Sequence, residues 1–281
     1  MEVIPMIKTV EITTLEGLMP LLSQQHYNKM IDRNRSSYLY RGMPDSSYAL
    51  TTSLRQNCKQ QARTIEPSIL RNFSKYAAAE EPIIATSVWR QMILGQHHGL
   101  PTRLLDWSYS PLIALNFAVT ERDLRDMDQH DCVVWRMDMA ELHSLLPGKY
   151  QARRKLNKST AFTVNMLYDV APTLRQYDED MGDHAMVVIE PPSIDPRIIN
   201  QYSFFSVIPS GMTDIEDFLD RNTVHTAKYI IGRELRWRVR DMLDQLNINE
   251  RIVYPGLDGL STWLARYYYV KEEPHDASDA D

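Results

Sequence analysis

The hydrophobic and polar positions of the chain follow two periods, one of two residues and one of three to four. Residues 36–42 alternate between the two kinds of side chain, which predicts a short strand. Its tyrosines, Tyr38 and Tyr40, would share one face of a sheet, and Leu39 and Arg41 the opposite face. Apolar runs that end in polar residues or proline predict further strands at 131–139, 184–192 and 203–209.

Helical spacing of apolar residues occurs in longer segments. We expect helices over 11–31, 66–94 and 226–246. Strands and helices do not alternate regularly, so the sequence predicts an α+β fold with a mixed or antiparallel sheet core and flanking helices. No linker rich in glycine, serine or proline divides the chain, so we expect a single domain over 1–271, with an N-terminal helix and a C-terminal helical part. The acidic residues 272–281 predict a disordered tail.

The segment 95–118, GQHHGLPTRLLDWSYSPLIALNFA, combines a predicted strand with a predicted helix. Pro111 suits the first turn of a helix because its missing N–H would have no partner there, and Ser110 before it is a favourable N-cap. The helix that follows is apolar nearly all round, which predicts burial. Leu104 and Leu105 indicate a buried strand or extended segment just before it.

Polar residues lie at the junction between this strand and this helix: Arg103, Asp106, Ser108 and Ser110. Two interpretations remain open. Arg103 and Asp106 can pair with each other while the serines only cap the helix. Alternatively, the N-terminus of the helix faces an anionic ligand, because its free N–H groups and its dipole favour negative charge.

Composition limits the classes of function. The 281 residues carry 43% hydrophobic side chains, 24% charged side chains and a formal net charge of −6, which is typical of a globular protein and argues against an unselective nucleic-acid binder. Neither a signal peptide nor a long apolar segment is evident, and the two cysteines, Cys58 and Cys132, lie far apart. We therefore expect a cytoplasmic protein without membrane contact.

Metal binding is not expected from the sequence. The cysteines show no metal-type spacing. His97 and His98 are adjacent and would project to different sides of a helix or strand, so they form a poor chelate. Neither of the common glycine-rich phosphate loops is present.

Several blocks follow one another in an order that resembles the FRG domain family, named for its Phe/Tyr-Arg-Gly motif. They are YLYRG (38–42), YALTTSLRQ (48–56), QHHGLPTRLLDWSYSPLIALNFAV (96–119), RIINQYSFF (197–205) and VYPGLDGLSTWL (253–264). The resemblance extends from about Leu39 to Leu264. It implies little chemistry, because the family is largely uncharacterised.

A more distant resemblance is to the ADP-ribosyltransferase fold. A strand that ends in Tyr-Arg-Gly and a serine-bearing strand that leads into the helix S-P-x-x-A-x-x-F-A carry this likeness. It implies that NAD is the substrate, that Arg41 contacts its phosphates or ribose and that the Gly42 backbone contacts its nicotinamide amide. Ser108 or Ser110 would support them.

The same resemblance places an acidic residue before the last strand, where this chain has Gln201. A glutamine can hydrogen-bond a ribose hydroxyl but cannot act as a general base. Glu190, at the end of another predicted strand, is the alternative candidate. NAD hydrolysis, transfer to an unusual acceptor and nucleotide binding without chemistry all stay open.

Two hypotheses follow. In the first, an ADP-ribosyltransferase-like domain binds NAD or a related nucleotide in a pocket made by Arg41, Gly42 and the region from Thr102 to Ser110, with a protein or nucleic acid as acceptor. Arg103 and Asp106 would then hold Arg41 in register. In the second, a module without catalysis binds protein or nucleic acid through basic segments such as 149–162.

Overall fold

The computed structural model describes residues 7–23, 25–29, 31–79, 82–193 and 195–271 of the chain. Within these residues, one mixed sheet of seven strands has the order β1-β9-β6-β4-β5-β8-β7. In sheet order the strands are β1 (Lys8–Ile12), β9 (Ala227–Ile231), β6 (Cys132–Asp138), β4 (Tyr38–Met43), β5 (Leu104–Ser108), β8 (Ser203–Val207) and β7 (Val187–Ile189). β1 is parallel to β9, and the other pairs are antiparallel. The predicted α+β fold with a mixed sheet is therefore confirmed.

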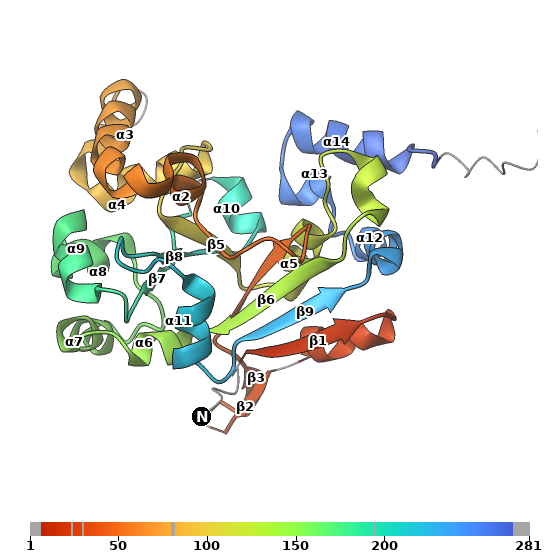
Figure 1. Cartoon of the computed structure of the whole chain (residues 1–281), viewed down its shortest axis with the longest axis horizontal. Coiled ribbons are helices and arrows are strands. Elements are labelled where there is room, and N and C mark those ends of the chain that lie inside the picture. Colours follow the sequence, from red (N-terminus) through yellow and green to blue (C-terminus); the bar gives the residue numbers. More distant parts are fainter. Residues whose placement is uncertain (1–6, 24, 30, 80–81, 194, 272–281) are drawn as a thin grey trace, which may run out of the picture.

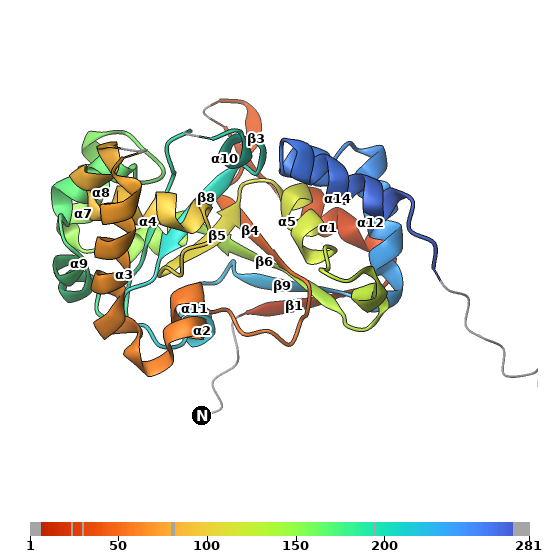
Figure 2. The same ribbon diagram turned by 90° about the horizontal axis from the view of Figure 1, so that it is seen from above.

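Helices flank the sheet in two groups. Figures 1 and 2 show α3, α4, α7, α8 and α9 beside β8 and β7, and α5, α12 and α14 toward the opposite end. The longer helices are α2 (Ser53–Cys58), α3 (Ala62–Ala77), α4 (Val88–His97), α5 (Pro111–Ala118), α6 (Met139–Ser144), α7 (Gly148–Leu156), α8 (Val164–Val170), α9 (Leu174–Met181), α11 (Ile215–Asn222), α12 (Arg236–Gln245) and α14 (Leu257–Tyr267). The shorter ones are α1 (Met19–Ser23), α10 (Pro196–Asn200) and α13 (Glu250–Val253).

Short 3-10 turns and a small hairpin complete the described elements. The turns are η1 (Glu16–Leu18), η2 (Lys59–Gln61), η3 (Pro82–Thr86), η4 (Leu124–Asp128) and η5 (Arg233–Leu235). The hairpin pairs β2 (His26–Asn28) with β3 (Arg33–Arg35).

The alternation of β4 places its side chains in separate hydrophobic clusters, as the sequence predicts. Tyr38 and Tyr40 pack in one cluster with residues of α5 and α12. Leu39 and Met43 pack in another cluster, with side chains of β6 and α11. The strand is central and buried on both faces, and this burial fixes its register.

Two predicted helices are partly wrong because sheet pairing overrides helical spacing. In the segment 11–31, β1 ends at Ile12 beside β9, and only Glu16–Leu18 and Met19–Ser23 are helical before the β2–β3 hairpin. In the segment 226–246, residues 227–231 form β9, because Tyr229 and the isoleucines favour a strand between two neighbours. The helix proper is α12.

The predicted helix over 66–94 is divided. α3 ends at Ala77, and α4 starts afresh at Val88, where Ser87 caps it by accepting a hydrogen bond from the backbone N–H of Trp89 at 3.2 Å. The other predicted strands are present, although β7 is shorter than the predicted 184–192. At α5 the predicted cap is confirmed, since Ser110 Oγ accepts from the N–H of Ile113 at 3.4 Å.

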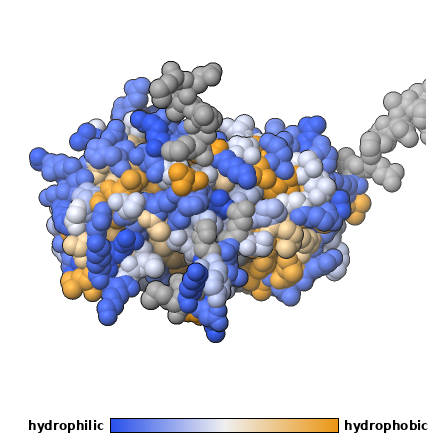
Figure 3. Space-filling model, turned by 90° about the horizontal axis from the view of Figure 1, so that it is seen from below, coloured by the Kyte–Doolittle hydropathy of each residue, from blue (hydrophilic) through white to orange (hydrophobic). Residues whose placement is uncertain are grey.

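The polarity of one face of the molecule and the length of the described helices bear on membrane contact. Figure 3 shows a face on which hydrophilic side chains predominate and hydrophobic ones form separate patches. No helix among the described residues is both long and apolar enough to cross a bilayer. The predicted tail at 272–281 lies outside the described residues, and a single domain over 1–271 stays a prediction.

Candidate functional site

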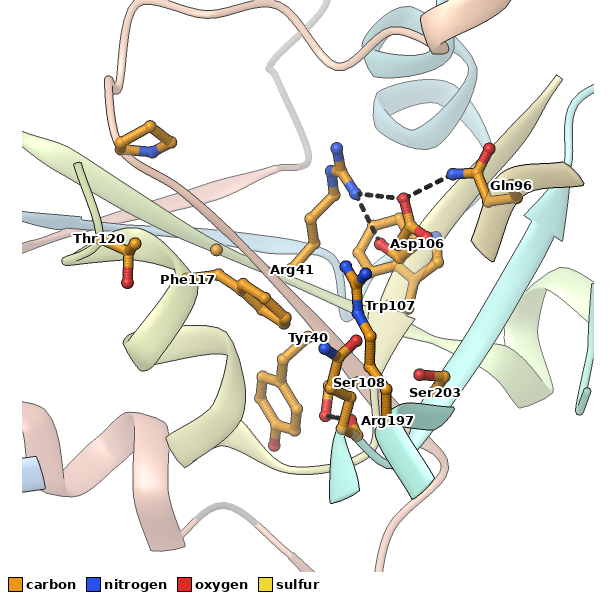
Figure 4. Close-up of a pocket in the computed structure, with 13 residues that line it drawn as sticks. Tyr40, Arg41, Gln96, Asp106, Trp107, Ser108, Phe117, Thr120, Arg197 and Ser203 are labelled. Carbon is orange, nitrogen blue, oxygen red and sulfur yellow. Dashed lines mark hydrogen bonds and ion pairs between the residues drawn. The ribbon is translucent and has the colours of Figure 1, made fainter. Parts of the chain in front are cut away.

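A cleft opens where two central strands separate. β4 and β5 pair only through Tyr40 and Ser108, and beyond this pair their backbones diverge. The cleft has a volume of about 370 Å³. Its lining comes from β4, β5, α4, α5, α10 and β8: Tyr40, Arg41, Gly42, Pro44, Gln96, Asp106, Trp107, Ser108, Phe117, Thr120, Arg197, Gln201 and Ser203 (Figure 4).

Arg41 bridges the two diverging strands. Its Nη1 donates to the backbone carbonyl of Asp106 at 2.9 Å and lies 3.5 Å from the Asp106 carboxylate. The Arg41 side chain is 24% exposed, whereas that of Asp106 is 54% exposed. Burial lowers the pKa of Arg41, and Asp106 opposes this shift. Of the residues from Thr102 to Ser110, Asp106 is therefore the one that contacts Arg41.

Part of the Arg41 guanidinium remains unused. Nε is buried and has no hydrogen-bond acceptor among the residues that the structure describes. A buried donor without an acceptor destabilises the fold by about 1–3 kcal/mol. Because Nε is shielded from solvent, a ligand in the cleft could contact the 24% exposed remainder of the side chain but not Nε itself.

Two consecutive side-chain hydrogen bonds orient the carboxylate of Asp106. Gln96 Nε2 donates to the Asp106 carboxylate at 2.9 Å, and Thr102 Oγ1 donates to Gln96 Oε1 at 2.6 Å. Thr102 is itself buried and accepts from the Leu104 N–H at 3.1 Å. Thr102 thus fixes the Gln96 amide and does not itself line the cleft.

The two candidate serines, Ser108 and Ser110, both form hydrogen bonds with nearby backbone groups. Ser108 Oγ donates to the backbone carbonyl of Gln201 at 2.7 Å and accepts from the Ser110 N–H at 3.0 Å. Ser108 is only 2% exposed. It therefore joins β5 to the end of α10 and sets the floor of the cleft, while Ser110 caps α5.

Gly42 lies at the cleft, and its lack of a side chain is required by packing. A Cβ at this position would lie 1.8 Å from the Ala114 carbonyl oxygen and 2.6 Å from the Ala118 nitrogen. The backbones of β4 and α5 thus approach too closely for any other residue. This close approach brings Phe117 of α5 to the wall of the cleft.

The two candidates for the acidic position lie in different places. Gln201 lines the cleft, and its Nε2 donates to the Val253 carbonyl at 3.2 Å. Its Oε1 has no partner among the described residues. Glu190 lines a separate pocket with Arg90 and Asn165. The structure therefore brings Gln201, and not Glu190, to Arg41.

The sequence did not single out Arg197, which also lines the cleft. Its guanidinium lies 4.9 Å from the centre of the Tyr254 ring, and that ring meets Phe117 edge-on at 6.3 Å between centroids. Asp195 and Pro196 form a helix-start signal that could have placed Arg197 in a first helical turn. No local pattern indicates that this turn reaches the cleft.

Comparison with known families gives one result. Residues 36–127 match the model of the FRG domain. The chain contains an FRG domain. The matched segment includes the Tyr-Arg-Gly strand and the whole 96–119 block, whereas the similar blocks at 197–205 and 253–264 lie beyond it. No curated protein and no solved structure matches the chain.

The FRG domain supplies only part of the cleft. Arg41, Asp106 and Phe117 lie within the match, and Arg197 and Gln201 follow it. In Figure 4 the side chain of Arg197 extends from α10 toward the side of the cleft occupied by Asp106 and Arg41. The matched segment therefore contributes one wall, and later residues complete the site.

Another conspicuous arginine of the FRG domain, Arg103, does not hold Arg41. It is 4% exposed and forms ion pairs with Glu66 and Asp178. Burial works to lower the pKa of Arg103, but the two carboxylates raise it above its ordinary value. The expected support of Arg41 by Arg103 is wrong, because an odd separation along extended backbone turns Arg103 and Asp106 to opposite faces.

Metal-ligating atoms gather at one place among the described residues, formed by Asp138, Glu141 and His225. These groups already bind the protein. Asp138 caps α6 by accepting from the Ala140 N–H at 2.8 Å, and Glu141 accepts from the N–H groups of Val224 and His225. The cluster therefore has a structural explanation.

Several basic residues that could bind nucleic acid or protein are already bound to other side chains of the chain. Arg236 and Arg240 are 0% exposed, and they bind Glu121 and Asn116 respectively. Arg153 of the 149–162 segment pairs with Asp169. Arg236 and Arg240 of α12 are thus buried in the core, whereas Arg233, just before this helix, is exposed.

Proposed function

We propose that the cleft binds NAD and that the protein breaks the bond between nicotinamide and ribose, as an NAD glycohydrolase or ADP-ribosyltransferase does. The observation that carries the proposal is the convergence of Arg41, Asp106 and Gln201 on one cleft where β4 and β5 diverge. The distant resemblance to the ADP-ribosyltransferase fold, through the Tyr-Arg-Gly strand and the S-P-x-x-A-x-x-F-A helix, supports it.

Binding follows from the charge and shape of the cleft. Arg41 uses Nη1 to contact Asp106 and keeps Nη2 for a phosphate, and the planar fork of an arginine suits phosphate oxygens. Phe117, which is half-buried at the wall of the cleft, offers aromatic surface for a flat ring such as adenine or nicotinamide. The volume of about 370 Å³ falls in the range of small-molecule sites, roughly 300–1,000 Å³.

The chemistry needs a negative group beside a developing positive charge. When the carbon–nitrogen bond breaks, its electron pair leaves with nicotinamide and the ribose becomes cation-like. The Asp106 carboxylate, half exposed in the cleft, can stabilise that cation and accept a proton from an attacking water. Gln201 Oε1 can accept a hydrogen bond from a ribose hydroxyl. The products are nicotinamide, ADP-ribose and a proton.

Two variants separate binding from turnover. Arg41→Gln should weaken NAD binding roughly 10- to 100-fold, because hydrogen bonds to charged groups contribute about 1.5–3 kcal/mol. Asp106→Asn should reduce release of nicotinamide, measured by chromatography, much more than it reduces NAD affinity, measured by calorimetry. A matched control is Arg125→Gln, which removes an exposed arginine paired with Asp123 in the same FRG domain.

The result that contradicts the proposal is clear. If wild-type protein neither binds NAD in calorimetry nor gains thermal stability with it, the cleft is not an NAD site. Short nucleic acids belong in the same thermal-shift series, since ligands that bind only the native state raise its melting temperature. Stabilisation by nucleic acid alone would favour the binding-module hypothesis.

A further inference from the structure

Arg197 gives the cleft a second positive charge. It lies in the first turn of α10, half-buried, and lines the cleft opposite the FRG domain segment that carries Arg41. No carboxylate among the described residues lies within ion-pair distance of its guanidinium. Because Arg41 shares its charge with Asp106, Arg197 provides the net positive charge of the cleft.

The Arg197 side chain is held in place by an aromatic ring. Its guanidinium lies over the ring of Tyr254, 4.9 Å from the centroid, and Phe117 packs against that ring in an edge-to-face arrangement. An arginine over an aromatic face is stabilised by the ring quadrupole while its N–H groups, which lie in the guanidinium plane, stay available. This arrangement orders the side chain without consuming its hydrogen bonds.

The backbone around Arg197 is tied to the C-terminal part of the chain. Asp195 caps α10 by accepting from the Arg197 N–H at 2.6 Å. Asn200 Nδ2 and Gln201 Nε2 donate to the carbonyls of Ile252 and Val253, at 2.8 and 3.2 Å. Tyr254 follows directly after these carbonyls, so the same contacts position both the arginine and the ring beneath it.

We propose that Arg197 binds a second phosphate and makes the cleft selective for ligands with a diphosphate over ligands with a monophosphate. This inference rests on the proposed function, because it assigns the diphosphate of NAD to Arg41 and Arg197 together. Two fixed guanidinium groups from different walls can each take one phosphate of a diphosphate. A single phosphate can satisfy only one of them fully.

The selectivity is tested with ADP-ribose and AMP, which differ in having a diphosphate or a monophosphate. Calorimetric titration should show that Arg197→Gln weakens ADP-ribose binding roughly 10- to 100-fold and AMP binding by much less. Arg251→Gln is the matched control. Arg251 also lies over an aromatic ring, that of Trp263 at 4.9 Å, but it does not line the cleft.

The positioning role of Tyr254 gives a second measurement that does not alter the arginine. Tyr254→Leu should weaken ADP-ribose binding, and Tyr254→Phe should retain it, because the phenyl ring preserves the contact with the guanidinium. Thermal denaturation of each variant establishes that it is folded. Equal affinity of the Leu and Phe variants would overturn this role.

The outcomes distinguish the two proposals. If wild-type protein binds neither NAD nor ADP-ribose, the proposed function fails and the diphosphate assignment fails with it. If wild-type protein binds both and Arg197→Gln weakens ADP-ribose and AMP equally, or weakens neither, only the diphosphate assignment is wrong. Loss of ADP-ribose affinity with little loss of AMP affinity supports it.

Discussion

The close approach of Gly42 to α5, beside the cleft, can be tested by a single substitution. Substituting Gly42→Ala adds one methyl group where β4 crosses α5. That carbon would lie 1.8 Å from the Ala114 carbonyl oxygen. Carbon and oxygen atoms in non-bonded contact normally stay about 3.3 Å apart or more. The strand and the helix must therefore separate by about 1.5 Å, the difference between these two distances.

The expected loss in the free energy of unfolding lies at the upper end of the range for overpacked cores. Extra methyl groups in a packed core typically cost about 1–3 kcal/mol. Here the obstacles are backbone atoms of Ala114 and Ala118 in a buried helix, which cannot move aside as a flexible side chain can. We expect a loss of about 3 kcal/mol in the free energy of unfolding. At roughly 2–4 °C per kcal/mol for a chain of this size, the melting temperature should fall by about 6 °C or more.

The assay is thermal denaturation followed by circular dichroism, with Gly148→Ala as the matched control. Gly148 opens α7, and a Cβ there would meet nothing within 4 Å. Alanine at such a compatible site is neutral or stabilises by about 0.4–1 kcal/mol. If Gly42→Ala melts as high as Gly148→Ala, the packing explanation of the motif glycine is wrong, and direct contact with a ligand becomes the better explanation.

Two further predictions concern buried charge. Arg103→Met should reduce the free energy of unfolding by about 3–5 kcal/mol in urea denaturation, because it leaves the carboxylates of Glu66 and Asp178 buried without their cation. A loss below about 1 kcal/mol would contradict this prediction and show that the two carboxylates relax into solvent. Burial, with a smaller effect of Arg154, lowers the pKa of His143 to about 3. The unfolded imidazole titrates near 6.5, so stability present above about pH 6.5 should be lost toward pH 3, by up to about 1.4 kcal/mol per pH unit. His143→Gln should show a shallower loss in urea denaturation between pH 7 and 5, and an unchanged slope would contradict the assignment.

Local signals in the sequence predicted the elements around the cleft well. The alternation in 36–42 gave β4 and its two faces, and Ser110 with Pro111 gave the start of α5. These features depend on neighbouring residues, so the sequence contains them. The expectation that Arg41 and the polar residues before Pro111 share one cavity was also correct for Asp106 and Ser108.

Features that depend on distant partners were missed. The sequence predicts helix where β9 lies, because the apolar spacing there fits both periods and only pairing with β1 and β6 decides between them. The ion-pair partners of Arg103 cannot be predicted from its neighbours in the sequence, because Glu66 and Asp178 come from other elements. The place of Arg197 in the cleft is not evident from the sequence, because Tyr254, which positions it, lies far along the chain.

The single residue pair between β4 and β5 also bears on how much of the chain is needed to fold. Residues 36–127 contain both of these strands, but their long partners, β6 and β8, come later in the chain. A fragment limited to the FRG match would leave each strand with an open edge of unpaired N–H and C=O groups, and exposed edges of this kind promote self-association. The matched segment is therefore better regarded as the middle of a larger cooperative unit than as a separable module.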